Sequence, residues 1–518
     1  MSKITIDPMT RIEGHLRVDI QEQDGVITEA RCGGTMARGL ELIFRGRDPR
    51  DIPILAQRIC GVCPQVHATA ASLAVDEAFG LKDQIPANGR LLRDIMLASN
   101  YLQSHILHFY HLSALDYVDV TAAARYDGDD PDLAAVSDFI GRGVLDPFVP
   151  RYEGDYRLSK EQNLAAVKHY VAALQVRRDC HEMLSIFGGK MPHQCAVAAG
   201  GVTTQVTLDK ITSALTYARE AAEFIERCYL PDVLMLARAY PDCLEIGKGC
   251  SRFLSYGVFA AAAGKPLFAA GLTDEAGQWR AFSADKITED VKNSYYADEC
   301  DNLHPSAGQT VPAPAKPGAY SWLKAPRYDA EPCEVGPLAR MMVTYAAGSP
   351  DVKGAVDVLC RKVGIQPAAL NSTLGRHAAR ALEASILARK LQEWILKLQP
   401  GEPCVTKVEV PQQGRGAGLI DGPRGALGHW ITIDGGKVAN YQAVVPTTWN
   451  GSPRDSRGVP GPIEQALETQ AIHDLDNPFE VVRTIRSFDP CLACAVHVAR
   501  RKGSEVRIAQ VCERPAPQ

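Results

Sequence analysis

Residues 88–118 read NGRLLRDIMLASNYLQSHILHFYHLSALDYV, and this stretch gives the clearest structural signal in the chain. Its aliphatic and aromatic residues recur mostly at steps of three and four, and no proline interrupts them, which predicts a long helix. Similar patterns at residues 160–187, 208–239 and 367–398 predict three more long helices. Long helices bury their apolar stripes best against one another, so we expect a central helix bundle.

Strand-like segments lie near both ends of the chain. At the N-terminus, residues 4–6 and 15–20 alternate in hydrophobicity, and a turn at Asp24-Gly25 leads to another short strand from Val26, which predicts an antiparallel hairpin. Residues 430–445 form strand-length segments with an Asp-Gly-Gly turn between them. We therefore expect an α+β fold that is mainly α, with small peripheral antiparallel β elements at both ends of the chain.

Connectors rich in proline and glycine separate these segments. Residues 310–318 and 412–428 are the most prominent, and we expect both to be loops. Neither resembles a flexible interdomain linker, because the proline-rich pieces are short and are flanked by aromatic residues. The sequence therefore favours one compact unit.

The composition argues against several classes of protein. The 518 residues are 46% hydrophobic and 23% charged, which is ordinary for a globular protein. The formal net charge is -5, so the chain has no basic excess and nucleic acid is not an expected partner. No uninterrupted apolar run reaches the roughly 18 residues that a membrane helix needs, so we expect no direct membrane span.

Two short cysteine motifs carry the expected chemistry. CGVC at residues 60–63 is followed by His67, and CLAC at residues 491–494 is followed by His497. The C-x-x-C spacing lets both thiolates of a pair face one metal, so the two pairs supply four sulfur ligands from opposite ends of the chain. Four thiolates suit zinc, an iron-sulfur cluster or another thiophilic transition metal, and a redox-active cysteine pair is a further alternative.

Other motifs accompany the two cysteine pairs and give the chain a family resemblance. They are TRIEGH at residues 10–15, RGLE at 38–41, EVGPLAR at 334–340, PRGAL at 423–427 and VPTTWN at 445–450. In this order they resemble the large, catalytic subunit of nickel-iron hydrogenases, from about Ile4 to His497. Residues 100–105 and 187–193 look closest to the nickel-iron-selenium branch of that family. The resemblance disfavours zinc and implies reversible heterolytic cleavage of H2.

The resemblance also implies a ligand set. The cofactor would be a nickel-iron centre whose iron carries one CO and two cyanides. Cys60 and Cys491 would be terminal ligands of nickel, and Cys63 and Cys494 would bridge nickel and iron. Thiolates are soft donors that suit a redox-active nickel. The selenium branch carries selenocysteine at the position of Cys491, so we expect a sulfur ligand and a plain nickel-iron site here.

Residues that handle the proton and the open metal edge follow from the same resemblance. Cys491 would act as the base in H2 cleavage, and Glu13 would relay the proton onward. From the residues alone, Glu13 could instead form a salt bridge with Arg11. Arg424 would lie over the open edge of the metals, oriented by Asp489, although a buried structural ion pair would look the same in sequence.

Three further residues are expected at the cofactor. Thr447 would donate a hydrogen bond to a cyanide, although its neighbour Thr448 could be the donor instead. His67 would donate to a bridging sulfur, unless it is an ordinary core histidine. Pro423 directly precedes Arg424 in the same motif. Ser104 stands where some relatives have an acidic residue above the metals.

A hard cation, usually Mg, would lie at Glu41 and His497. Carboxylate oxygen suits Mg, while imidazole is a less typical ligand, so iron is the alternative. Glu334 would reach this ion through water. Family members are cut after the histidine of the second motif by a maturation endopeptidase, so residues 1–497 would form a single mature domain. Residues 498–518 would be a C-terminal extension, removed once nickel and iron insertion proteins have loaded the site.

Partners and location also follow from the resemblance. The chain has no further cysteine motif for an electron-transfer cluster, so an iron-sulfur small subunit is expected as its partner in a heterodimer, which could assemble further. That subunit would make the enzyme periplasmic or membrane-associated, with a cytoplasmic location as the alternative. Two other functions remain: an H2-sensing regulatory subunit, a class that typically lacks a cleaved extension, and a non-catalytic protein with a structural four-cysteine zinc site.

Overall fold

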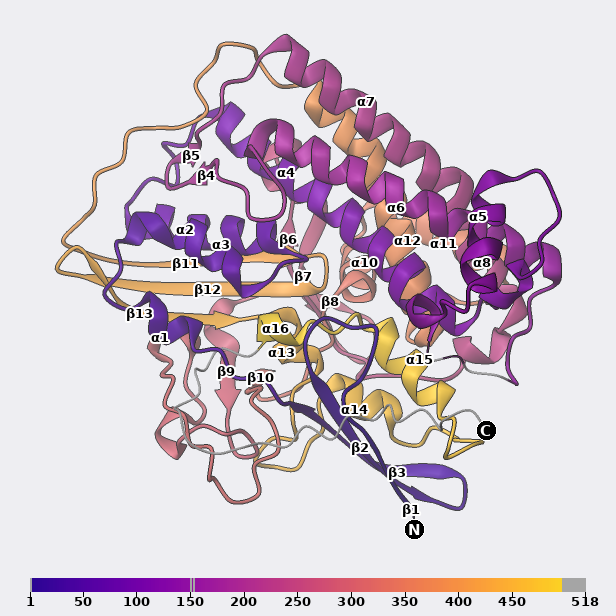
Figure 1. Cartoon of the computed structure of the whole chain (residues 1–518). Coiled ribbons are helices and arrows are strands. Elements are labelled where there is room, and N and C mark those ends of the chain that lie inside the picture. Colours follow the sequence, from indigo (N-terminus) through magenta and orange to yellow (C-terminus); the bar gives the residue numbers. More distant parts are fainter. Residues whose placement is uncertain (1, 150, 152–153, 496–518) are drawn as a thin grey trace.

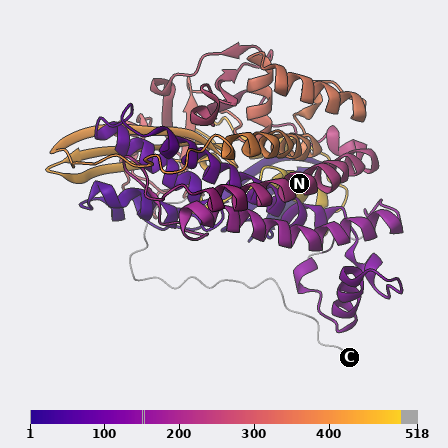
Figure 2. The same ribbon diagram turned by 90° about the horizontal axis from the view of Figure 1, so that it is seen from above.

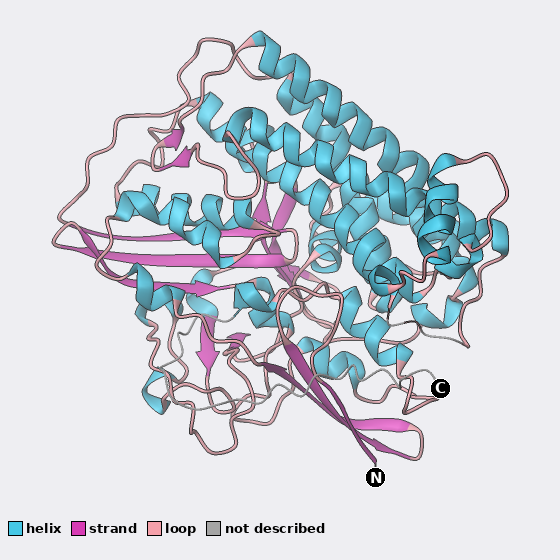
Figure 3. Ribbon diagram, viewed as in Figure 1, coloured by secondary structure: helices cyan, strands magenta, loops and turns pink. Residues whose placement is uncertain are grey.

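The computed structural model describes residues 2–149, 151 and 154–495 (Figure 1). All four long helical segments expected from the sequence are present. They are α4 (Ala87–Ile106), α6 (Lys160–Gly188), α7 (Leu208–Phe224) with its continuation α8 (Leu230–Ala239), and α12 (Thr373–Ile395). Together with several small antiparallel sheets they give an α+β fold (Figure 3).

Two helix boundaries differ from the expectation. After α4 the chain continues through a π-helical segment, Leu107–Ser113, and does not remain α-helical to residue 118. Helix α12 begins at Thr373, because Pro367–Leu370 form a separate short 3₁₀ helix. The side chain of Ser372 then accepts a hydrogen bond from the backbone N–H of Gly375, which caps the new helix.

Helix α4 has other parts of the protein on every side. Every residue from Leu91 to Ile106 is buried, which is typical of a helix that is surrounded rather than lying on a surface. Helix α4 contacts α6 and α12, α6 contacts α7, and α7 contacts α12. The view from above shows these long helices lying alongside one another (Figure 2).

The N-terminal strands β1 (Ser2–Ile6), β2 (Leu16–Gln23) and β3 (Val26–Gly34) form an antiparallel sheet, which confirms the predicted hairpin. Ile4 lies opposite Ile20, and Val18 opposite Cys32. The connection between β1 and β2 carries Glu13.

A second sheet confirms one expectation and corrects another. It consists of β11 (Gln413–Gly422), β12 (Gly425–Asp434) and β13 (Lys437–Val444). Strands β12 and β13 account for the predicted strand-length segments. Residues 412–428 were expected to be a loop, but they form β11 and the start of β12. The prediction was wrong because it took the glycines as turn residues.

The glycines of β11 serve close packing against α3 (Pro64–Ala78). A Cβ atom on Gly416 would lie 2.1 Å from the carbonyl oxygen of Ala74, and one on Gly418 would lie 1.8 Å from that of Ala70. Glycine therefore lets the strand backbone lie directly on an alanine-rich helix. Because α3 starts just after Cys63 and β11 leads to Arg424, this contact positions two parts of the candidate site.

The remaining elements are short helices and small sheets. The helices are α1 (Leu40–Phe44), α2 (Ile52–Ala56), α5 (Pro131–Gly141), α9 (Ala260–Ala263), α10 (Pro337–Ala346), α11 (Pro350–Val363), α13 (Pro446–Asn450), α14 (Pro462–Leu467), α15 (Phe479–Ser487) and α16 (Leu492–Ala495). The strands are β4 (Val197–Ala198), β5 (Gly201–Val202), β6 (Phe253–Val258), β7 (Phe268–Thr273), β8 (Trp279–Arg280), β9 (Ile287–Asp290) and β10 (Ala325–Tyr328). Strands β4–β10 lie mid-chain, so β structure is not confined to the two chain ends as expected.

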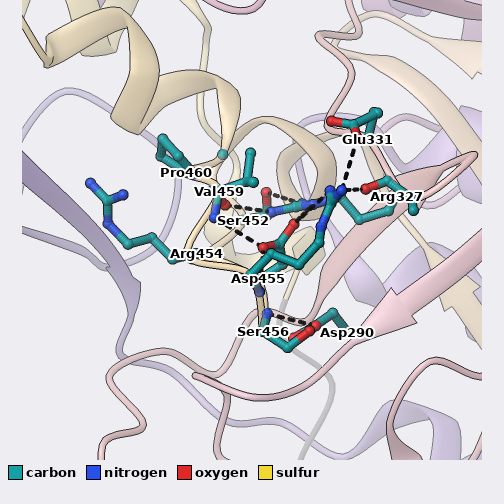
Figure 4. Close-up of polar contacts among 12 residues, drawn as sticks. Asp290, Arg327, Glu331, Ser452, Arg454, Asp455, Ser456, Val459 and Pro460 are labelled. Atoms are coloured by element: carbon teal, nitrogen blue, oxygen red, sulfur yellow. Dashed lines mark hydrogen bonds and ion pairs between the residues drawn. The ribbon is translucent and has the colours of Figure 1, made fainter.

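A buried polar cluster fixes the loop that follows α13 (Figure 4). Arg327 on β10 pairs with Asp455 at 3.0 Å and donates to the hydroxyl of Ser452 at 3.1 Å. The backbone N–H of Ser456 donates to Asp290 at 2.8 Å. Both partners of the ion pair are buried, so losing one would leave the other charge without compensation. The cluster thus anchors the loop directly after α13, the helix that carries Thr447.

Candidate metal centre

The two cysteine motifs meet although they lie at opposite ends of the chain. Cys60 and Cys63 lie just before α3. Cys491 directly precedes α16, and Cys494 lies within that helix. The four sulfur atoms all lie within 4.8 Å of one another, and all four side chains are buried. In the described part of the chain, no other group of three or more His, Cys, Asp or Glu side chains brings its ligand atoms this close together.

The four sulfur atoms lie close together, and each cysteine of one motif contacts a cysteine of the other. Cys60 Sγ lies 3.4 Å from Cys491 Sγ, and Cys63 Sγ lies 3.4 Å from Cys494 Sγ, so each contact joins one motif to the other. The two sulfurs of the second motif are 2.9 Å apart. A metal bound among these sulfurs would therefore have ligands from both motifs within reach.

Electrostatics of the four thiols favour a bound cation. Burial raises the pKa of Cys491 and of Cys494 well above the ordinary value. Burial acts in the same direction on Cys60, but hydrogen bonds from the other thiols and the charge of Arg424 lower its pKa. Four buried thiolates in such a small volume require a compensating positive charge, and sulfur donors suit a thiophilic transition metal. The donor set therefore fits the nickel-iron centre that the sequence predicts.

The N-terminal segment holds the second motif in place. The backbone N–H of Leu492 donates to the carbonyl oxygen of Glu13 at 2.7 Å. Gly14 has a positive φ of 82°, and a Cβ there would lie 2.6 Å from the backbone nitrogen of Ala493. Arg38 donates to the carbonyl oxygens of Ile59 and Ala493 and so links the two motifs.

Glu13 lies beside the sulfur of Cys491. Its Oε2 accepts hydrogen bonds from the Cys491 thiol and from the backbone N–H of Ala493, each at 3.1 Å. Burial and the negative charge of Cys60 raise the pKa of Glu13. Arg11, the alternative partner in the sequence, instead pairs with Asp116 at 2.6 Å. The Glu13 carboxyl is thus placed to exchange a proton with the cysteine.

Arg424 and Asp489 form a buried pair next to the thiols. Arg424 Nη2 lies 3.0 Å from Asp489 Oδ1, and Arg424 also donates to the hydroxyl of Ser104 at 3.3 Å. Although burial by itself acts to lower it, the pKa of Arg424 is raised because Asp489 and the nearby cysteines favour its charged form. Arg424 therefore stays a cation beside the sulfur cluster.

A small cavity adjoins the metal ligands and brings the other predicted cofactor residues together. It is lined by Cys63, Val66, His67, Gly422, Pro423, Arg424, Leu427, Pro446, Thr447, Cys491 and Cys494. The Thr447 hydroxyl oxygen accepts from the backbone N–H of Cys491 at 2.9 Å, which leaves its own hydrogen available to donate. Thr448 instead donates to the carbonyl oxygen of Ala495 at 3.4 Å.

Glu41 lies in a separate buried cluster. One of its oxygens accepts from the backbone N–H of Ala443 at 2.9 Å, and the other accepts from the hydroxyl of Thr310. Lys324 and Glu289 pair close by, at 2.9 Å. Burial and the charge of Glu41 raise the pKa of Glu289. Burial acts to lower the pKa of Lys324, but the charges of Glu289 and Glu41 raise it. Sequence analysis missed these two residues, since no motif or spacing marks them. His497 and the extension 498–518 lie outside the described residues.

Glu334 forms a buried ion pair with Arg376 on α12. Both of its oxygens accept from Arg376, each at 2.8 Å, in a buried ion pair. This two-point contact ties the segment before α10 to α12, and the contact of Glu334 with a hydrated ion stays a prediction.

Comparison with known proteins agrees with this geometry. Residues 38–497 match the family described as nickel-dependent hydrogenase, and residues 3–32 match one described as HoxL-like. The chain belongs to the nickel-dependent hydrogenase family. It is therefore the large, catalytic subunit of a hydrogenase, an oxidoreductase that acts on H2.

Several relatives in this hydrogenase family resemble the chain along nearly its whole length. The periplasmic [NiFeSe] hydrogenase large subunit of Desulfomicrobium baculatum is 40% identical over 98% of this chain and 97% of its own. The hydrogenase-2 large chain of Escherichia coli is 37% identical over 97% and 98%. The reduced Ni-Fe-Se hydrogenase of Desulfovibrio vulgaris Hildenborough superimposes with a TM-score of 0.86 at 42% identity, covering 96% of this chain and 100% of that one. No helix within the described residues has both the length and the apolar composition for crossing a membrane.

Proposed function

We propose that this hydrogenase subunit cleaves H2 heterolytically and reversibly at a nickel-iron centre held by Cys60, Cys63, Cys491 and Cys494. The observation that carries the proposal is the set of four buried sulfurs within 4.8 Å of one another, with a carboxyl 3.1 Å from one of them. Such a pairing of soft metal ligands with an adjacent proton acceptor is what heterolytic cleavage requires.

The cofactor would consist of nickel and an iron that carries one CO and two cyanides. Cys60 and Cys491 would bind nickel alone, while Cys63 and Cys494 would be shared with the iron. When bound, this centre supplies the Lewis acidity and the redox change that split H2. The cavity beside the ligands is lined by Pro423, Arg424 and Thr447, and the guanidinium and the hydroxyl would be donors to the small iron-bound ligands.

The protein's own groups would manage charge and protons. The Cys491 sulfur would accept the proton of H2, and Glu13, in direct contact with that sulfur, would carry it away. Arg424 would compensate the negative charge of thiolates and cyanides, and Asp489 would hold its orientation. The Thr447 hydroxyl would donate to a cyanide, since its oxygen is already engaged with the backbone.

Other parts of the assembly complete the proposal. A magnesium ion, or iron in its place, would bind Glu41 and His497. Electrons would pass to the clusters of an iron-sulfur small subunit in a heterodimer, periplasmic or membrane-associated through that subunit. Nickel and iron insertion proteins and an endopeptidase that removes residues 498–518 would mature the chain. These points rest on family membership and, for the cation, on the buried carboxylate of Glu41 with Glu289 close by.

The ligand assignment can be tested by metal content. Cys60→Ser and Cys494→Ser variants, produced with the small subunit and maturation proteins, are expected to lose nickel and H2-dependent dye reduction together. Cys243→Ser, which changes a buried cysteine outside the four-sulfur group, is the matched control and is expected to retain both. Stoichiometric zinc in the active wild-type protein, in place of nickel and iron, would overturn the proposal.

A further inference from the structure

Three buried side chains form a hydrogen-bonded chain that leads inward from the cavity at the metal centre. His67 on α3 lines the cavity. Its Nδ1 lies 3.1 Å from Nε2 of His429 on β12, and Nδ1 of His429 is hydrogen-bonded to the hydroxyl of Tyr441 on β13. All three side chains are at most 1% exposed. These hydrogen bonds thus join the metal site to the interior of the sheet formed by β11, β12 and β13.

The hydroxyl of Tyr441 fixes the direction of these hydrogen bonds. A phenol ordinarily has a pKa of about 10. Burial raises the pKa of Tyr441 well above that value, so the hydroxyl keeps its hydrogen at neutral pH. Among the described residues, the hydrogen bond of this hydroxyl is made to Nδ1 of His429. Because a buried hydroxyl hydrogen needs an acceptor, Tyr441 donates and Nδ1 of His429 accepts.

The tautomers of both histidines follow from that direction. A neutral imidazole has one donor and one acceptor nitrogen. With Nδ1 accepting, His429 carries its hydrogen on Nε2 and donates it to Nδ1 of His67. His67 in turn must carry its hydrogen on Nε2, the nitrogen that is not used by His429.

We propose that Tyr441 and His429 are positioning residues that hold His67 in the tautomer that carries its hydrogen on Nε2, from which it would donate to a sulfur that lines the cavity. This inference rests on the proposed nickel-iron function. A fixed N–H donor stabilises negative charge on a thiolate ligand and so lowers the electron density that the thiolate gives to the metals. The pair would therefore tune the metal centre without touching it.

Infrared spectra of the matured heterodimer test the inference. Tyr441→Phe removes the outer donor, and His429→Leu removes the donor to His67. Both variants are expected to shift the CO and cyanide bands to lower wavenumber, because more electron-rich thiolates increase the electron density on iron. His429→Gln retains an amide donor near the position of Nε2 and is expected to keep the bands close to those of wild type.

A buried tyrosine elsewhere provides the control. Tyr110 is 1% exposed, and its hydroxyl donates to Asp232 at 2.7 Å, so Tyr110→Phe makes the same chemical change away from His67. Unshifted bands in both Tyr441→Phe and His429→Leu would overturn the inference while leaving the proposed function intact, as would an equal shift in Tyr110→Phe. A wild-type enzyme without CO and cyanide bands would overturn the proposed function, and the inference with it.

Discussion

Glu13 acquires its proposed role from its surroundings rather than from its position in the sequence. It follows Arg11 closely, yet Arg11 pairs with Asp116 and Glu13 lies 3.1 Å from the sulfur of Cys491. Burial raises the pKa of Glu13, which brings proton uptake and release nearer to neutral pH. A carboxyl with these properties suits a relay next to a metal-bound sulfur.

Glu13→Gln is expected to lower H2 oxidation by at least about 100-fold, because an amide keeps the hydrogen bond from Ala493 but cannot carry the proton. Nickel and iron content should stay at the wild-type level, since Glu13 is not a ligand. Glu29→Gln, which changes a carboxylate of β3 paired with Arg31, serves as the control and should keep full activity. Rates and metal content measured on the same preparations decide the matter; wild-type turnover in Glu13→Gln would exclude the relay.

Individual residues differ in how far the sequence alone could predict them. The four cysteines and their partners Glu13, Arg424, Asp489 and Thr447 lie in short motifs, and the structure brings them together. The pairing of Lys324 with Glu289 could not be predicted, because no motif or regular spacing connects the two residues. Such a buried ion pair depends on which segments of the chain come together in the fold. The pairing of Glu334 with Arg376 of α12 is likewise not marked in the sequence, because the two residues are 42 positions apart.

Strand β11 shows where element prediction failed. Apolar periodicity was enough for the long helices, since it persists over many turns. Glycines at alternate positions can indicate either a flexible turn or a strand whose backbone packs closely against another element. Here only the position of α3 shows that the second interpretation is right. The π-helical segment after α4 likewise leaves no mark on the apolar pattern.

The close contact between β11 and α3 predicts a sharp difference between two glycine substitutions. Gly418→Ala would bring a methyl group into the backbone of α3 and is expected to destabilise the fold by about 3 kcal/mol. Gly354→Ala, in α11 with open space around it, should instead raise stability by up to about 1 kcal/mol. Denaturant unfolding of the heterodimer measures both, and equal stabilities of the two variants would refute the packing argument.

Helix α14 is tied to β3 through a buried carboxyl, which predicts a pH dependence. Glu464 accepts from the backbone N–H of Cys32 at 2.9 Å and from the hydroxyl of Tyr320 at 2.9 Å. Complete burial raises its pKa from 4.5 to about 7. The folded protein therefore holds a proton that the unfolded chain releases, so this contribution to stability is full at low pH and is lost as the pH rises toward 7.

Glu464→Gln should remove that dependence, because the amide stays neutral at every pH. Between about pH 5 and about pH 7, wild type is expected to lose about 2 to 3 kcal/mol relative to the variant. Unfolding free energies at the two pH values provide the measurement, with Glu29→Gln as the surface control. Parallel pH profiles for wild type and Glu464→Gln would show that Glu464 is ionised in the folded state throughout.

The whole molecule is organised so that its two ends complete one site. Cys491 and Cys494 reach Cys60 and Cys63 only when the C-terminal segment lies against Glu13 and Arg38. We expect a metal centre assembled in this way to close last, once the C-terminal segment is in place. This order agrees with the proposal that residues 498–518 are removed after metal loading, which would take the five basic and two acidic side chains of the extension with them.

The most direct test of the nickel-iron proposal is an infrared spectrum of the protein produced with its small subunit and maturation proteins, with the C-terminus verified by mass spectrometry. Polypeptide does not absorb in the triple-bond stretching region. We predict one band from an iron-bound CO and two from cyanides in protein that ends at His497. A folded, tail-cleaved protein that lacks these bands and contains zinc instead would contradict the proposal.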